Sequence, residues 1–183
     1  MSLKMITLAT CVAVIATSAL AHKGATGMLL ERMNGMLAMG KATKEISPMM
    51  RGQQDYDAAR TTAYAAVLKT HSGEAMLNLF PEGMNMKPSV AKEEIWSNWE
   101  EFAALADDLE IYAEALDMAA GNGISEMASD AASMMGDDTS GMMGNAEVTA
   151  LSLDALTALP VNMLFAQTAQ VCSACHSKFR ADE

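Results

Sequence analysis

The stretch VCSACHSKFR near the C-terminus holds the residues best suited to chemistry. Cys172 and Cys175 are three positions apart, and His176 follows the second cysteine directly. Three kinds of site use such a cysteine pair: a zinc site, a redox-active dithiol and a covalent attachment point for haem. The spacing alone leaves all three open, so the residues around the pair must decide between them.

The adjacent histidine favours haem attachment. A structural zinc site needs four ligands, and the motif supplies three. A thioredoxin-like dithiol belongs near a βαβ pattern, whereas this pair lies at the end of a chain with helical composition. In a C-x-x-C-H motif both thiols form thioethers with the haem, and the histidine becomes the proximal iron ligand. We therefore predict one covalently bound haem c, with its iron, per chain, held by Cys172, Cys175 and His176.

Residues 1–21 have the pattern of a secretory signal peptide. A short positive segment, MSLK, precedes the apolar run MITLATCVAVIATS and an A-x-A cleavage signal. We expect cleavage between Ala21 and His22, export to the periplasm, and a mature domain of residues 22–183 without a membrane span. Cys11 leaves with the peptide, so only the two cysteines of the motif remain.

The chain is acidic, with a formal net charge of −11. Removal of residues 1–21, which contain Lys4 and no acidic residue, makes the charge −12. Such a charge argues against binding to nucleic acid or to an anionic membrane. It suits docking on basic patches of partner proteins.

The composition favours helices, because alanine, leucine, methionine and glutamate dominate. Apolar spacing predicts four helices: about Ala25–Ile46, Tyr56–Leu79, a third around Ile95–Leu116, and Glu147–Phe179. Four helices with short connections predict an all-α fold, an antiparallel four-helix bundle with the haem near the C-terminal helix.

Local signals refine the helix boundaries. We expect Ser47-Pro48 to interrupt the first helix, Asp55 or Asp57 to cap the second, and Pro160 to kink the last. Residues 121–144 are rich in Gly, Ser, Asp and Met and predict a flexible insertion.

The third helix carries the clearest apolar stripe, with Ile95, Phe102, Leu109 and Leu116 at intervals of seven residues. We expect Trp96, Trp99 and Phe102 to pack in the core beside the haem.

The chain resembles the class II cytochromes c, the family that contains cytochrome c′ and its low-spin relatives. A C-terminal CSACH followed by an aromatic residue and an arginine is similar to the family's haem motif on the last helix of a four-helix bundle. RGQQDYDAA resembles the family's loop into the second helix, and EEIWSNWEEF the opening of the third. The resemblance covers nearly all of the mature chain, with the insertion at 121–144 as the main departure.

The resemblance also implies residues on the distal side of the haem. An arginine of the first helix reaches the propionates in this family, and the residue four positions later lies over the iron. These positions correspond to Arg32 and Met36, which the i, i+4 spacing places on one helical face. The resemblance further implies that Arg180 packs near the haem edge or a propionate.

Other residues remain rivals for the distal position. Met33 and Met39 lie close to Met36 on the same helix, and methionines on an apolar stripe commonly fill the core. His22 and His71 are rival ligands for a bis-histidine haem, although we expect both to be exposed.

These residues predict a periplasmic electron carrier with His176 and Met36 as axial ligands, most like the low-spin members of the family. Both axial positions would be filled, so we expect no enzymatic activity. Redox proteins with basic docking patches are the expected partners, and the family resemblance implies a homodimer through the first two helices. The alternative is a five-coordinate cytochrome c′ that binds NO or CO in an apolar distal pocket.

Overall fold

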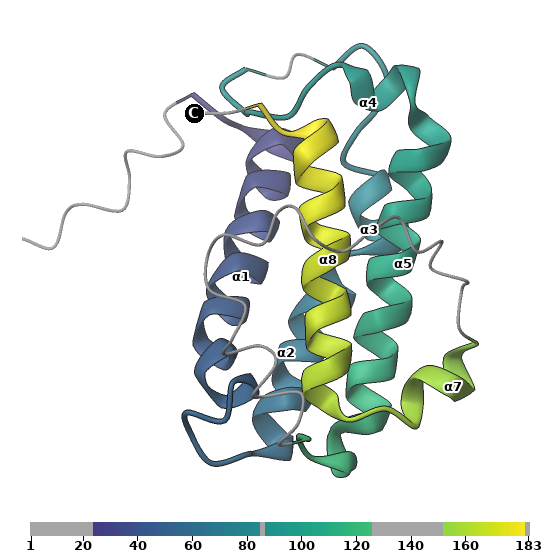
Figure 1. The fold of residues 1–183 in the computed structure, drawn as a ribbon. Coiled ribbons are helices and arrows are strands. Elements are labelled where there is room, and N and C mark those ends of the chain that lie inside the picture. The colour runs from purple at the N-terminus through teal and green to yellow at the C-terminus, as the bar shows by residue number, and fades with distance from the viewer. Residues whose placement is uncertain (1–23, 85–86, 126–151, 182–183) are drawn as a thin grey trace, which may run out of the picture.

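The computed structural model describes residues 24–84, 87–125 and 152–181 (Figure 1). The predicted signal peptide and most of the insertion at 121–144 lie outside these residues and stay predictions. The elements are the α-helices and one 3-10 helix, η1: α1 (Gly27–Met50), α2 (Ala58–His71), α3 (Gly73–Leu77), α4 (Glu94–Ser97), α5 (Trp99–Met118), η1 (Ala119–Asn122), α7 (Leu153–Thr157) and α8 (Val161–Phe179). None of the described helices is long and apolar enough to cross a membrane.

The four long helices α1, α2, α5 and α8 form an antiparallel bundle. In Figure 1, α8 runs between α1 and α5, with α2 behind, and successive long helices point in opposite directions. The apolar faces meet in one core, and its largest fully buried side chains include Met49, Leu68, Ile95, Phe102, Leu116 and Leu164. The predicted fold class is confirmed.

The apolar stripe of the third predicted helix faces this core. Ile95, Phe102, Leu109 and Leu116 are between 0 % and 5 % exposed. The helix itself is divided, because α4 ends at Ser97 and α5 begins at Trp99. The heptad pattern therefore predicted which face is buried and missed the short break at Asn98.

The first helix continues through Pro48 to Met50, so the predicted interruption at Ser47-Pro48 is wrong. Proline lacks the N–H that would bond to the carbonyl one turn earlier, which disfavours it inside a helix. Here it stands in the last turn, and the chain turns immediately afterwards. Gly52, with φ +69°, donates its N–H to the Met49 carbonyl at 3.0 Å.

The second predicted helix is broken near its C-terminal end. Asp57 is its N-cap, as expected, and accepts hydrogen bonds from the N–H groups of Ala59 and Arg60. The chain leaves helical geometry at Ser72, and Gly73, with φ +52°, is the first residue of α3. The left-handed conformation at Gly73 creates this corner, which the apolar pattern did not predict.

Pro160 separates two helices rather than kinking one. It stands with extended backbone at the N-cap of α8, and α7 ends before it at Thr157. Its fixed φ and missing N–H are compatible with a helix start, where the first N–H groups have no partner inside the helix. The part of the predicted helix before Ser152 lies outside the described residues.

Truncation of a core residue tests the buried face of α5. Leu116 is 0 % exposed, whereas Ile111 on the same helix is 42 % exposed. We expect Leu116→Ala to lower the free energy of unfolding by about 2–5 kcal/mol, because it leaves a cavity in the core. Ile111→Ala, the matched control, should change it by less than about 0.5 kcal/mol. Denaturant unfolding of both variants measures this, and equal losses would contradict the assigned core face.

Tyr64 of α2 contacts residues of both α1 and α8 in the core. Its ring is 4 % exposed and lies 5.8 Å from the Phe165 ring between centroids, and its hydroxyl lies 3.4 Å from the Thr43 hydroxyl. Burial raises the pKa of Tyr64 to about 12.

This pKa predicts a loss of stability at alkaline pH. An unfolded tyrosine ionises near pH 10, so above that pH the unfolded state releases a proton that the folded state still holds. The contribution of Tyr64 is therefore complete below about pH 10 and is lost as the pH rises towards 12. We expect the free energy of unfolding to fall as the pH rises from 9 to about 12, with Tyr64 adding at most about 1.4 kcal/mol per pH unit to this slope. The fall should be less steep in Tyr64→Phe. Identical pH profiles would count against this assignment.

Candidate haem site

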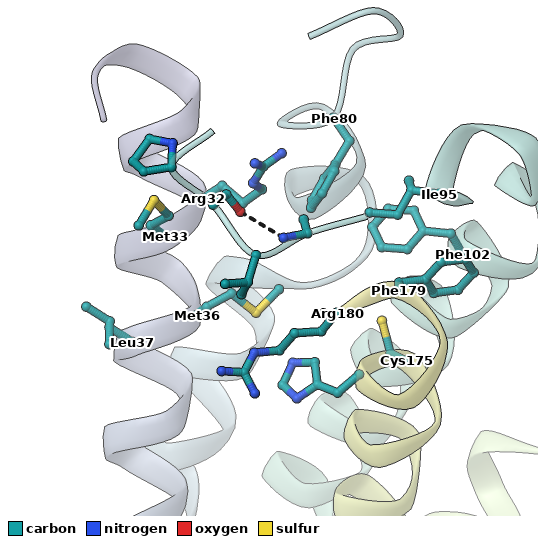
Figure 2. Close-up of a pocket in the computed structure, with 15 residues that line it drawn as sticks. Arg32, Met33, Met36, Leu37, Phe80, Ile95, Phe102, Cys175, Phe179 and Arg180 are labelled. Atoms are coloured by element: carbon teal, nitrogen blue, oxygen red, sulfur yellow. Dashed lines mark hydrogen bonds between the residues drawn. The ribbon is translucent and has the colours of Figure 1, made fainter. Parts of the chain in front are cut away.

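A cavity of about 370 Å³ lies between α1 and the C-terminal end of α8 (Figure 2). Its size falls within the range of ligand pockets, roughly 300–1,000 Å³. Its walls are mostly apolar, with Met33, Leu37, Phe80, Val90, Ile95, Phe102 and Phe179 among the lining residues. The predicted site residues Arg32, Met36, Cys175, His176 and Arg180 line the same cavity.

The last two turns of α8 supply the C-x-x-C-H motif. Cys175 and His176 line the cavity, whereas Cys172 is half-buried one turn earlier, against the core. The three-residue spacing places both cysteines on one side of the helix. Both are free thiols in this structure, since neither forms a disulfide.

Burial controls the protonation of these groups. It raises the pKa of Cys172, and it raises the pKa of Cys175 to about 11 with a smaller contribution from Cys172. Partial burial, and then the nearby Arg180 cation, lower the pKa of His176. The lowered pKa favours the neutral imidazole, which is the form that binds metals.

The opposite wall of the cavity is a face of α1. Arg32, Met33, Met36 and Leu37 line it, and Figure 2 shows the Met36 side chain directed from α1 towards the side of Cys175 and Arg180. Met39 is 8 % exposed and lies away from this cavity, beside a second and much smaller one. Met39 therefore does not face the haem cavity, and Met33 is the methionine that remains as a rival of Met36 for the distal position.

Arg32 is buried at the edge of the cavity, with 4 % of its surface exposed. Its guanidinium lies 4.2 Å from the centroid of the Phe80 ring, and Nη1 is 3.9 Å from the Met84 sulfur. Burial lowers the pKa of Arg32, although an arginine stays charged throughout the ordinary pH range. A buried cation at this position can attract an anionic group of a ligand.

The loop before α4 closes the cavity, which the sequence analysis did not predict. Residues 88–91 line it, and this segment pairs with the end of α8. Lys92 donates its N–H to the Phe179 carbonyl at 2.9 Å, and Ala181 donates to the Val90 carbonyl at 2.7 Å. Arg180 forms an isolated antiparallel bridge with Ala91 while its side chain borders the cavity. Backbone pairing between distant segments leaves no pattern in the sequence.

Aromatic residues form the inner wall. The Phe102 ring contacts those of Phe80 and Phe179 at centroid distances of 4.8 and 5.4 Å, both in edge-to-face geometry. Trp96 is half-buried and donates its ring N–H to the Phe80 carbonyl at 3.1 Å. Trp99 stacks at a tilt on Phe102 but is 38 % exposed, so its predicted place in the core is wrong.

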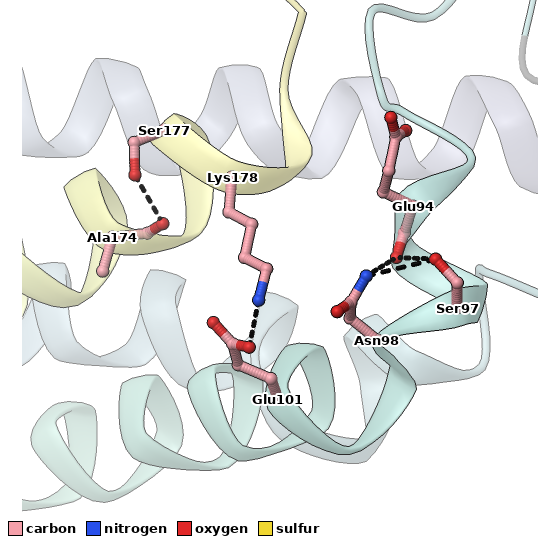
Figure 3. A network of polar contacts seen from close by, with 7 residues as sticks. All are labelled: Glu94, Ser97, Asn98, Glu101, Ala174, Ser177 and Lys178. Carbon is pink, nitrogen blue, oxygen red and sulfur yellow. Dashed lines mark hydrogen bonds and ion pairs between the residues drawn. The ribbon is translucent and has the colours of Figure 1, made fainter.

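A polar network fixes the outer side of α8 to α5 (Figure 3). Lys178 forms an ion pair with Glu101, and the Lys92 ammonium donates to the Lys178 carbonyl at 3.2 Å. An exposed ion pair contributes little to stability, about 0–1 kcal/mol. It nevertheless links the turn that follows His176 to the first turn of α5.

The two rival histidines have different outcomes. His22 lies outside the described residues. His71 was expected to be exposed, but it is half-buried at the end of α2, with its ring against Gly35 of α1. Within the described part of the chain, no three His, Cys, Asp or Glu residues gather to hold a metal ion.

The donor set fits a c-type haem. Cys175, the adjacent His176 imidazole and Met36 on the facing helix line one apolar cavity. Cys172 lies one turn earlier against the core, at the spacing for a second thioether bond. Arg32 and Arg180 add two cations at its edge.

Comparisons with known proteins agree with this description. A family model described as Cytochrome C' matches residues 28–141. The match ends before α8 and its CSACH motif, so it rests on the earlier helices and not on the cysteines. No curated protein matches the chain.

Solved structures of cytochromes c′ share the fold. The protein from Thermochromatium tepidum has a TM-score of 0.57 and 24 % identity, over 85 % of this chain and 95 % of that one. Ferric cytochrome c′ from Alcaligenes xylosoxidans has a TM-score of 0.53 and 22 % identity, over 85 % and 94 %. A nitric oxide complex of a variant of the latter has a TM-score of 0.52 and 22 % identity, over the same shares.

These structures are less than 25 % identical to the chain and therefore establish the fold alone. The family model covers more than half of the chain. The chain accordingly belongs to the cytochrome c′ family, whose members carry covalently attached haem c.

Proposed function

We propose that this chain is a periplasmic monohaem cytochrome that carries single electrons between redox partners. Haem c would be attached through Cys172 and Cys175, with His176 and Met36 as axial ligands. One observation carries the proposal: Met36 of α1 and His176 of α8 line the same apolar cavity from facing helices.

The haem, when bound, supplies an iron that alternates between its ferrous and ferric states. The chain's own residues would hold the group and set its surroundings. The His176 imidazole would offer a nitrogen to the iron, and the aromatic wall would keep water from the inner side. Arg32 and Arg180 suit the two propionates, because a guanidinium binds a carboxylate through paired hydrogen bonds.

A methionine as sixth ligand favours electron transfer over binding of a small molecule. With both axial positions filled, no open position remains for a gas or substrate. Methionine and histidine ligation raises the reduction potential, which suits a carrier. The proposal therefore assigns no enzymatic activity to the chain.

The charge of the chain supports basic redox partners. Its formal net charge is −11, from 23 acidic and 12 basic residues. Acidic surfaces accelerate encounter with basic ones. Export to the periplasm and assembly into a homodimer stay predictions from the sequence.

The second candidate function is gas binding by a five-coordinate cytochrome c′. The comparisons taken alone favour it over electron transfer, because the family is described as cytochrome c′ and two similar structures are nitric oxide or nitrosyl complexes. The apolar distal wall with Leu37 and Val90 is compatible with it. It requires that Met36 pack in the pocket without binding iron.

Replacement of Met36 separates the two functions. We expect native ferric protein to be low-spin by absorption and EPR spectroscopy, and Met36→Ala to be high-spin with a lower reduction potential. Met33→Ala is the matched control, since Met33 lines the same cavity from the same helix, and it should stay low-spin. A native protein that is already high-spin and binds carbon monoxide would establish the gas-binding function instead.

A further inference from the structure

The close contact between Gly35 and His71 has no role in the function proposed above. Gly35 is buried within α1, one residue before Met36. A Cβ atom at Gly35 would lie 3.0 Å from Nδ1, 3.3 Å from Cγ and 3.6 Å from Cε1 of His71. Three ring atoms at such distances place the imidazole directly over the helix backbone at Gly35.

This contact lies immediately behind the distal wall of the haem cavity. A second cavity, of only about 10 Å³, is bordered by Gly35, Met36, Met39, His71 and Met76, among others. Met36 thus borders both cavities, whereas His71 borders the second one only. A space of this size is at the lower limit for one water molecule, so the imidazole has little room to retreat.

The position of His71 is itself fixed. It is the last residue of α2, and the chain turns directly after it through Ser72 and Gly73, both buried. The Glu110 side chain lies over Gly73, so close that a Cβ there would overlap its carboxylate. His71 therefore stands at a buried corner of the backbone, directly before α3, which packs on α5.

We infer that His71 is a positioning residue for Met36. Its ring, packed on Gly35, sets the distance between α1 and the corner after α2, and this distance determines whether the Met36 sulfur reaches the iron. The inference rests on the proposed axial ligation. It also gives a reason for glycine in the middle of α1, where alanine would favour the helix.

A second glycine of α1 provides a matched control. No atom lies within 4 Å of a Cβ atom built at Gly40, which is exposed and five residues further along the helix. Gly40→Ala should raise the melting temperature and leave the haem spectrum unchanged, because it improves helix propensity without a new contact. Gly35→Ala introduces the same methyl group against the imidazole.

The test compares ferric holoprotein spectra of Gly35→Ala, His71→Ala, the double variant and Gly40→Ala. Overpacking of a tight site costs enough to change an equilibrium constant about tenfold or more. We therefore expect Gly35→Ala to shift the ratio of low-spin to high-spin haem about tenfold towards high-spin. His71→Ala should shift it in the same direction, because the support behind Met36 is lost.

The double variant distinguishes positioning from a general loss of stability. Removal of the ring frees the space that the methyl group introduced by Gly35→Ala needs, so the double variant should recover low-spin haem relative to Gly35→Ala alone. If Gly35→Ala and His71→Ala only lower the melting temperature and keep the spectrum of Gly40→Ala, the inference is wrong.

Failure of the proposed ligation gives a different result. If native protein is high-spin, Met36 is not a ligand, and the same variants are compared by carbon monoxide association with the ferrous protein. Positioning of Met36 in the pocket then predicts an association rate in Gly35→Ala several-fold different from that in Gly40→Ala. Equal rates in the two variants would overturn the inference even though the protein binds gas.

Discussion

The site depends on one constraint: α1 and α8 must lie side by side without packing closely against each other. α5 packs closely on both α2 and α8, whereas α1 approaches α8 only sparsely. The space left between α1 and the end of α8 is the cavity that Met36 and His176 both line. The tight half of the bundle supplies stability, and the loose half supplies the room for a planar cofactor.

Backbone pairing and burial then define the shape of that room. The backbone bridge between Ala91 and Arg180 holds the loop before α4 against the end of α8. This loop forms the outer wall of the cavity. Phe102, which belongs to the heptad stripe of the core, also forms the inner wall. The same side chains therefore stabilise the bundle and exclude water from the site, so substitutions at Phe102 would affect both properties.

Much of the fold and part of the site could be predicted from the sequence. Helical periodicity identified the buried face of α5, and the C-x-x-C-H spacing identified the end of α8 that borders the cavity. The resemblance to class II cytochromes c identified Arg32 and Met36, and the structure places both at the cavity. These features are local in sequence or carried by a specific motif.

The remainder was missed because it depends on contacts between distant segments. Nothing in the pattern around residues 88–91 indicates pairing with the end of α8, and nothing around His71 indicates a ring packed on Gly35. The exposure of Trp99 was missed for another reason, because a large apolar residue beside a core position need not itself be buried. The breaks at Asn98 and Ser72 reflect local backbone geometry that the apolar pattern does not encode.

The central claim is that a methionine sulfur from α1 faces the haem iron opposite His176. Proton NMR of the ferrous holoprotein tests it directly, because the ring current of the porphyrin strongly shifts the methyl group of a bound methionine. The account predicts one methyl signal far upfield of all other methyl groups, and its loss from a sample in which Met36 is replaced. A ferrous spectrum without such a signal, with the broad shifted resonances of a paramagnetic five-coordinate iron, would contradict the account and support gas binding.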